Sequence, residues 1–379
     1  MFGQTLAIIR NTFFESIRQP ILLVMLVVAT IGLIFCNLLA GFTMEDDQRM
    51  MVDLGLSTVF LCGTLLAAFI ATNVLNREIE NFTALTVISK PVARPIFVLG
   101  KFLGVAGALV LATVYLSFVF LLVEMHGVLE TVRQPIHLPV IVFGVGAGGL
   151  SVAAALWCNY FYGKVFSSTV ICLVTPLAGL AYLFSLMFDT GFAVQPISVS
   201  FDGQLWLALT SIMMAILVLT AIAIAASTRL GQVLTLCTTL GIFLLGMLSD
   251  WMFGRELNRI REMWLQRASA LGQTEIISET RLVELASTGE VQTKTEQIEQ
   301  ALAPLSSFAD GLAERIEYAA YWTAYAVLPN FQVFWLSDGV TQDHVIPPGY
   351  VGLTLIYGPL YILAALSVAV ILFQRREVG

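Results

Sequence analysis

The feature that most constrains this chain is a succession of long apolar runs separated by short polar breaks. A helix needs roughly 20 mostly apolar residues to cross the hydrocarbon core of a bilayer, and about eight runs reach that length. They are Pro20–Phe42, Leu54–Leu75, Ile96–Val123, Pro139–Trp157, Ser168–Phe188, Leu205–Ala226, Val233–Phe253 and Tyr350–Phe373. None of them alternates apolar and polar residues with a period of two, so helices are favoured over the strands of a barrel.

The composition supports the same class of protein. Of the 379 residues, 58% are hydrophobic and 12% are charged, whereas soluble domains carry about 25% charged residues. We therefore expect an all-α, polytopic membrane helical bundle of about eight transmembrane helices. The first run is too long for the apolar region of a signal peptide and lacks a cleavage site, so it is expected to remain as a span. Basic residues are few and scattered, which argues against a nucleic-acid partner.

The distribution of Lys and Arg predicts the orientation, because short cytoplasmic loops are enriched in both. With a cytoplasmic N-terminus, the basic residues of the inner loops and tails are Arg10, Arg18, Arg77, Lys90, Arg94, Lys101, Lys164, Arg229, Arg375 and Arg376. The short outer loops hold only Arg49 and Arg133. We expect a multi-pass protein of the cytoplasmic (inner) membrane, with the lipid bilayer around it and both termini in the cytoplasm.

Two segments outside the spans have patterns of their own. Residues 1–19 form an amphipathic helix expected to lie in the membrane interface. Its predicted apolar stripe consists of Phe2, Leu6, Ile9, Phe13 and Ile17. Residues 20–253 hold seven helices, residues 254–349 form an extracytoplasmic helical segment, and residues 350–379 form the eighth helix and a cytoplasmic tail.

Within the extracytoplasmic segment we expect short helices at Glu275–Leu285 and Thr293–Leu302. Ala319–Leu336 is expected to dip into the outer interface and to break at Pro329, because its aromatic residues favour the headgroup level. Four arginines close to the seventh run oppose the orientation, but loops longer than about 60 residues translocate largely regardless of charge. The alternative is that one member of the pair Leu205–Ala226 and Val233–Phe253 does not fully span, which would place this segment inside.

The loop between the second and third spans, residues 76–95, is the densest polar block between apolar runs. Glu78, Glu80 and Thr83 open it, three apolar residues give it a second face, and Lys90 precedes a proline. A short helix with one apolar and one charged side suits insertion into a groove on a soluble partner. The alternative interpretation is a solvated connecting loop.

Several motifs are better explained by packing than by chemistry. Residues 144–149 match G-x-G-x-x-G, but they lie inside an apolar run and not in a βαβ unit, so Gly144 and Gly148 are expected to let helices approach closely. Gly100 and Gly104 form a second such step. The sequence around Lys101 lacks the upstream glycine and the Ser or Thr of a P-loop, so the chain is not expected to bind ATP.

Catalytic chemistry has no support in the sequence either. The three histidines are isolated, and the five cysteines contain no C-x-x-C pair, so we expect no catalytic residue, metal site or disulfide framework. The middles of the predicted spans carry almost no ionisable residue, which argues against a proton- or sodium-coupled transporter.

Read together, these pieces resemble the permeases of ABC-2 type transporters. The resemblance rests on Asn11–Pro20, Arg77–Thr83, Ser89–Arg94, Phe97–Phe102 and Leu328–Phe331, and on the ending Phe373–Glu377. It implies a non-enzymatic membrane subunit of an exporter that pairs with a separate ABC ATPase, which would bind ATP and Mg. A second permease copy, identical or different, is implied as well.

The resemblance also implies roles for particular residues. Contact with the ATPase would fall to a coupling helix containing Glu78, Glu80, Thr83, Lys90 and Arg94. Pro329, Asn330 and Phe331 would lie on an external re-entrant segment near the exit.

The chain departs from the simple family pattern, in which six spans are common. It has the additional hairpin Leu205–Phe253, and its external segment is long. Two other classes therefore stay open: a membrane scaffold whose extracytoplasmic segment binds a partner, and a membrane-embedded enzyme.

Overall fold

The computed structural model describes residues 2–41, 47–80, 94–128, 136–284, 291–301, 303–342 and 344–374, with the backbone alone at 75–80, 276–284 and 291–301. The part of the chain that it describes is an all-α polytopic bundle with one small β-hairpin. Seven of its helices are long and apolar enough to cross a membrane. They are α2 (Pro20–Ala40), α3 (Asp47–Glu80), α5 (Arg94–His126), α6 (Leu138–Tyr162), α7 (Phe166–Leu186), α8 (Gly203–Ser227) and α13 (Pro348–Gln374).

Seven of the eight predicted spans are thus confirmed by length and composition, and the eighth differs. The run Val233–Phe253 forms α9 (Gln232–Met247), which has only 16 residues. It reaches the length of a span only together with the following helix, from which it is bent by 48°. A π-helical turn, η2 (Asp250–Gly254), begins directly after the break, and π-turns often accompany sharp kinks.

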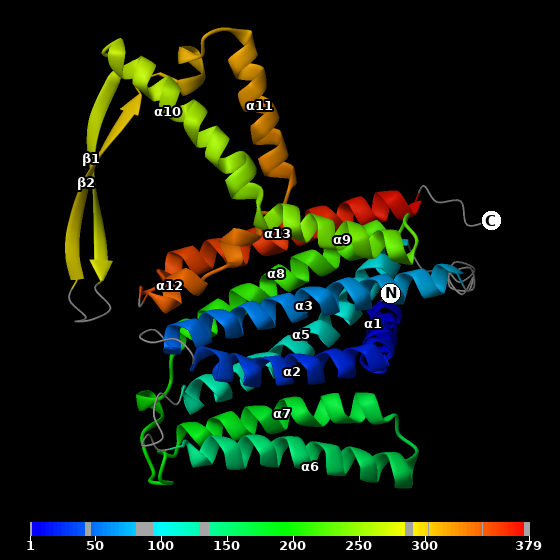
Figure 1. The fold of residues 1–379 in the computed structure, drawn as a ribbon. Coiled ribbons are helices and arrows are strands. Elements are labelled where there is room, and N and C mark those ends of the chain that lie inside the picture. Colours follow the sequence, from blue (N-terminus) through cyan, green and yellow to red (C-terminus); the bar gives the residue numbers. More distant parts are fainter. Residues whose placement is uncertain are drawn as a thin grey trace.

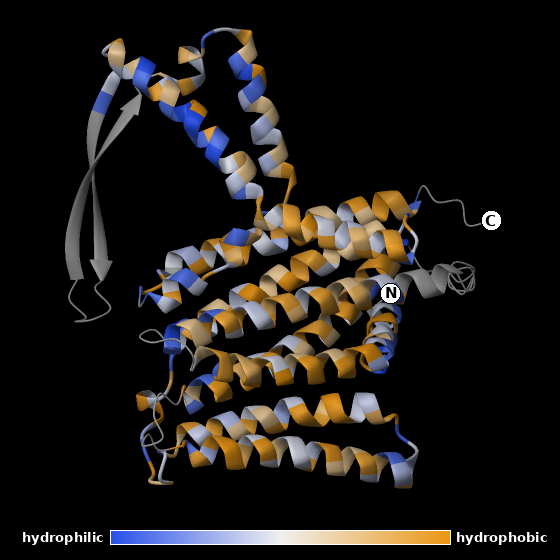
Figure 2. Ribbon diagram, viewed as in Figure 1, coloured by the Kyte–Doolittle hydropathy of each residue, from blue (hydrophilic) through white to orange (hydrophobic). Residues whose placement is uncertain are grey.

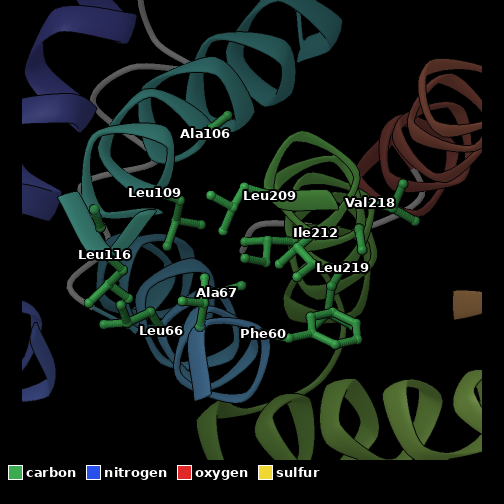
Figure 3. Close-up of a cluster of buried hydrophobic side chains, with 14 of the residues drawn as sticks. Phe60, Leu66, Ala67, Ala106, Leu109, Leu116, Leu209, Ile212, Val218 and Leu219 are labelled. Carbon is green, nitrogen blue, oxygen red and sulfur yellow. The ribbon is translucent and has the colours of Figure 1, made fainter. Parts of the chain in front are cut away.

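Three helices form the centre of the bundle. The apolar windows of α3, α5 and α8 are 61%, 61% and 72% buried, whereas those of α6 and α13 are 17% and 22% buried. Figure 3 shows the side chains that meet there, with Leu66 of α3, Leu109 of α5 and Ile212 of α8 among them. The outer helices keep apolar side chains on their free faces (Figure 2), as expected of a surface that faces lipid.

Helix α1 (Phe2–Ile17) runs across one end of the bundle, transverse to the spans (Figure 1). Its buried side matches the predicted stripe only in part. Ile17 is buried as expected, whereas Leu6 is exposed and the small polar residues Thr12 and Ser16 are buried. The small polar residues lie inside because glycines of α5 let the two helix backbones approach closely at this contact. The short distance leaves little room for larger side chains on α1.

After α9 the chain leaves the bundle and returns to it. It runs through α10 (Arg255–Ala270), strands β1 (Thr274–Glu284) and β2 (Val291–Ala301), the 3-10 turn η3 (Leu305–Phe308) and α11 (Leu312–Val327). The predicted helices at Glu275–Leu285 and Thr293–Leu302 were wrong, because both segments pair as an antiparallel hairpin from Thr274↔Ala301 to Glu284↔Val291. Threonine, isoleucine and valine recur in both strands, and such β-branched residues favour strands over helices.

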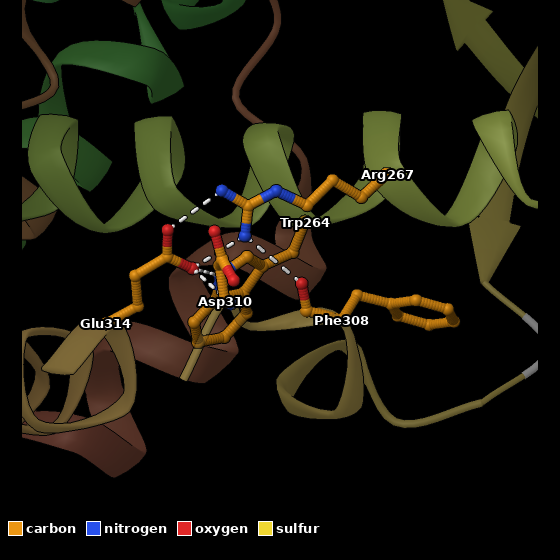
Figure 4. Close-up of polar contacts among 5 residues, drawn as sticks. All are labelled: Trp264, Arg267, Phe308, Asp310 and Glu314. Atoms are coloured by element: carbon orange, nitrogen blue, oxygen red, sulfur yellow. Dashed lines mark hydrogen bonds and ion pairs between the residues drawn. The ribbon is translucent and has the colours of Figure 1, made fainter. Parts of the chain in front are cut away.

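A buried tryptophan and an ion pair hold α10 against α11 (Figure 4). Arg267 donates from both terminal nitrogens to the two carboxylate oxygens of Glu314, at 2.7 and 2.8 Å, and Trp264 Nε1 donates to Glu314 Oε2 at 3.0 Å. The guanidinium of Arg267, the backbone N–H of Asp310 and the indole of Trp264 lower the pKa of Glu314 from 4.5 to about 2. We name the segment from α10 to α11 the projecting hairpin. It is a folded unit with its own small core.

The chain re-enters the bundle through another 3-10 turn, η4 (Phe331–Phe334), and a short helix, α12 (Ser337–Thr341), which lead into α13. The predicted break at Pro329 corresponds to the end of α11 at Val327 and the extended residues that follow.

Candidate functional site

The two ends of the bundle differ in charge. At the end where α1 lies, the described Asp, Glu, Lys and Arg side chains are mostly basic: Arg10, Arg18, Arg94, Lys101, Lys164 and Arg229, with Glu15 as the exception. The opposite end carries Asp47, Asp53, Glu124, Asp189, Asp202 and Asp338, with Arg49 as the exception. We refer to these as the basic end and the acidic end. Both are fixed by contacts between distant elements: Arg94 Nη1 donates to the Gln374 carbonyl at 2.6 Å, and Ser337 Oγ donates to Asp53 Oδ1 at 2.5 Å.

The predicted coupling segment belongs to the basic end. Helix α3 continues to Glu80, past the end of its apolar run at Leu75, and α5 begins at Arg94. Glu78 and Glu80 therefore lie in the last turns of α3. Thr83 and Lys90 fall outside the described residues. Arg94 is tied to the C-terminal end of α13.

Beside this segment, α1 is seated closely on α5. A Cβ atom on Gly104 would lie 2.5 Å from Thr12 Cβ and 2.8 Å from the Ile9 carbonyl oxygen, and one on Gly100 would lie 2.8 Å from Ile8 Cγ2. Only glycine fits at such distances, which let the two backbones approach. Lys101 Nζ adds an ion pair with Glu15 at 3.5 Å, with the lysine side chain 3% exposed. Helix α1 is thus fixed to the helix that follows the predicted coupling segment.

The second predicted glycine pair lies elsewhere in the fold. A Cβ on Gly144 would meet Leu122 Cδ1 at 3.8 Å, which is ordinary contact, and one on Gly148 would meet nothing within 4 Å. Helix α6 is a peripheral helix, so these glycines face open space or a loose contact within this chain.

The predicted re-entrant residues form a junction between α9, α11 and α13, which we name the Asn330 junction. Phe331 is fully buried against Gly246 of α9, where an added Cβ would lie 2.5 Å from Phe331 Cδ2. The Phe331 ring lies 5.7 Å from that of Phe243, which in turn lies 5.2 Å from Phe60 of α3. The apolar half of the junction is therefore part of the main core.

The polar half of the Asn330 junction is a hydrogen-bond network. The backbone N–H of Asn330 donates to Tyr357 Oη at 3.1 Å, and its Nδ2 donates to Tyr325 Oη at 2.9 Å. Asn330 Oδ1 accepts from the N–H of Gln332 at 3.0 Å and so caps η4. Tyr325 Oη donates to Asp250 Oδ1 at 3.4 Å. Tyr361 Oη donates to the carbonyl of Val327.

Sequence reasoning found Pro329, Asn330 and Phe331 but missed Asp250, Tyr357 and Tyr361. A signal was present for the tyrosines, because a spacing of four places both on one face of α13. Asp250 directly follows an apolar run, and nothing in the sequence joins it to a tyrosine 75 residues away.

Neither end shows a constellation for covalent or metal chemistry in the described ranges. No group of three or more His, Cys, Asp or Glu side chains there could hold a metal ion. The five cysteines are free thiols. What the arrangement offers is mechanical: two long helices that border residues 81–93 and are joined to the core.

Comparison with known proteins gives no further guidance, because no protein-family model, curated protein or solved structure matches this chain.

Proposed function

We propose that this chain is the membrane-spanning permease subunit of an ATP-driven exporter of the ABC-2 type. It couples to a separate ATPase through residues 76–95 and works with a second permease copy. The observation that carries the proposal is the position of that segment, between two long helices at the basic end of a multi-pass bundle. The sequence around Glu78 and Lys90 resembles that of such permeases, and this resemblance is the reason for proposing the ABC-2 type.

The charge difference between the two ends supports the orientation. Basic residues favour the cytoplasmic side of an inner membrane, so the basic end faces the cytoplasm and the acidic end faces outward. A partner that hydrolyses ATP in the cytoplasm can then reach residues 76–95. The first and last described helices end at the same side, since α1 and the last residue of α13 are at the basic end.

An external energy source is consistent with the spans themselves. The middles of the seven long helices carry no acidic or basic residue. Ion-coupled transporters need such groups to carry protons or sodium ions through the bilayer. The energy in this proposal comes from nucleotide binding in the partner, which biases the permease between two arrangements of the same helices.

The close contact between α1 and α5 provides a path for that bias. Movement of residues 81–93 displaces the start of α5. Helix α1 moves with α5, because the two backbones are in close contact at Gly100 and Gly104. The other end of α5 lies in the core beside α3 and α8. Packed elements of this kind move as rigid bodies.

The proposal is tested by purifying the chain from its native membrane and asking whether an ATPase with a P-loop accompanies it. We expect Glu78→Lys and Glu80→Lys to weaken that association or uncouple ATP hydrolysis from transport, without loss of membrane insertion. Glu317→Lys, a charge reversal at an exposed position of α11, is the matched control and leaves the association intact. A native complex without an ATPase, or full coupling in both variants, contradicts the proposal.

A further inference from the structure

The depth at which the projecting hairpin leaves the bundle follows from Tyr361. This residue is the midpoint of the 27-residue helix α13 (Pro348–Gln374), about 20 Å from either end at 1.5 Å per residue. The ends are fixed in the bundle, since Gln374 meets Arg94 at the basic end and Ile346 N–H donates to Gln204 Oε1 at the acidic end. Tyr361 Oη donates to the carbonyl of Val327, the last residue of α11. Helix α11 therefore joins the bundle near the middle of the spans.

The other arm of the projecting hairpin, α10, leaves the bundle at a similar depth. Helix α9 begins at the basic end, where Gln232 contacts Asn73 of α3, and its 16 residues cover about 24 Å. That length is shorter than the roughly 30 Å of hydrocarbon in a bilayer. Asp250 and α10 follow immediately. Figure 1 shows α10 and α11 rising from the side of the bundle above α9 and α13, and not from either end of the spans.

The groups found at this level are ones that lipid does not accommodate. Asp250 is exposed, Trp251 is 60% exposed, and the Arg255 guanidinium lies 5.2 Å from the centre of the Trp251 ring. The backbone between Val327 and Phe331 is not helical. Ionised side chains and irregular backbone occur within the hydrocarbon only where protein or water surrounds them.

We propose that the side of the bundle formed by α9, α11 and α13 borders a water-filled space that reaches to about half the depth of the membrane. The Asn330 junction is its inner wall, and the projecting hairpin stands in it. The space admits water and polar solutes, and the side chains of Asp250 and Arg255 border it. This inference requires only that the chain spans a membrane, and it holds whether or not an ATPase is the partner.

Labelling with a membrane-impermeant thiol reagent tests the proposal. Val327→Cys and Trp251→Cys place thiols beside the junction on its two arms. Leu363→Cys is the matched control, because Leu363 is 60% exposed, against 68% for Val327. It lies on nearly the opposite face of α13, two residues from Tyr361. Leu312→Cys, at the far end of α11, reports full access of the reagent.

The full-length chain is assayed in native membranes opened so that the reagent reaches both faces, and labelled peptides are counted by mass spectrometry. This readout keeps the five native cysteines separate. Only a hydrated thiol ionises and reacts, so we expect Val327→Cys and Trp251→Cys to react at least roughly tenfold faster than Leu363→Cys. Reaction of both at the rate of Leu363→Cys, with Leu312→Cys fully labelled, overturns the proposal.

Discussion

The α1–α5 contact and the Asn330 junction both attach a non-spanning segment to the same bundle, but by different means. At the first, glycines bring two helices together and one buried ion pair accompanies them. At the second, the backbone is irregular, and an asparagine with three tyrosines satisfies its polar groups. The first contact depends on shape and the second on hydrogen bonds. The difference matches what each does in our account: α1 must move with α5, and the junction must tolerate water.

The largest expected effect follows from the shape of the first contact. In Gly104→Ala the new methyl group collides with Thr12 and with the backbone oxygen of Ile9, so we expect the free energy of unfolding to fall by about 1–3 kcal/mol. Gly148→Ala is the matched control, because nothing lies within 4 Å of its Cβ. Thermal unfolding of both variants in detergent measures the difference. Equal stability of the two would show that α1 is not closely seated.

A second pair of substitutions separates hydrogen bonding from shape. Asn330→Ala removes a cap and leaves the N–H of Gln332 and the hydroxyl of Tyr325 without this partner, which should cost about 1–2 kcal/mol. Thr12→Val, at the α1–α5 contact, removes a buried hydroxyl that has no hydrogen-bond partner among the described residues, and is expected to be neutral or stabilising. The same unfolding assay applies. The reverse order of the two effects would refute the contrast.

The smallest expected effect concerns Glu314 in the first turn of α11, at the end of the projecting hairpin that is remote from both contacts. The Arg267 guanidinium lowers the pKa of Glu314 from 4.5 to about 2, so ionised Glu314 stabilises the hairpin above pH 4.5. That contribution is lost as the pH falls from 4.5 towards 2. Trp264 fluorescence should change over this range in the native chain and stay flat in Glu314→Gln. An identical titration of both proteins would exclude the ion pair as the cause.

Much of the fold could be predicted from the sequence, because burial in lipid leaves a plain signal. Long apolar runs place the seven full spans, and the bilayer permits little else. The β-hairpin could not be predicted in the same way. Strand β2 (Val291–Ala301) mixes charged and β-branched residues, and only its pairing with β1 decides between helix and strand. The end of α9 at Met247 could not be predicted either, because it falls inside an apolar run with no proline or glycine after it until Gly254.

The candidate site was predictable where it depended on a local pattern. The proline and asparagine at 329–330 broke a helix, and Gly100 and Gly104 are four residues apart. The partners across these contacts were not predictable, because Thr12 and Tyr357 reach them through tertiary packing between segments far apart in the sequence. Thr83 and Lys90 lie outside the described residues, so the role proposed for them is tested by experiment and not by packing contacts.

The most direct test of the account is the side of the membrane on which residues 76–95 lie. Thr83→Cys in sealed vesicles of known orientation should react with an impermeant thiol reagent only from the cytoplasmic face. The same result is expected from Lys164, labelled at its amine, which marks the basic end independently. Reaction of Thr83→Cys from the exterior would contradict the orientation and, with it, coupling to a cytoplasmic ATPase.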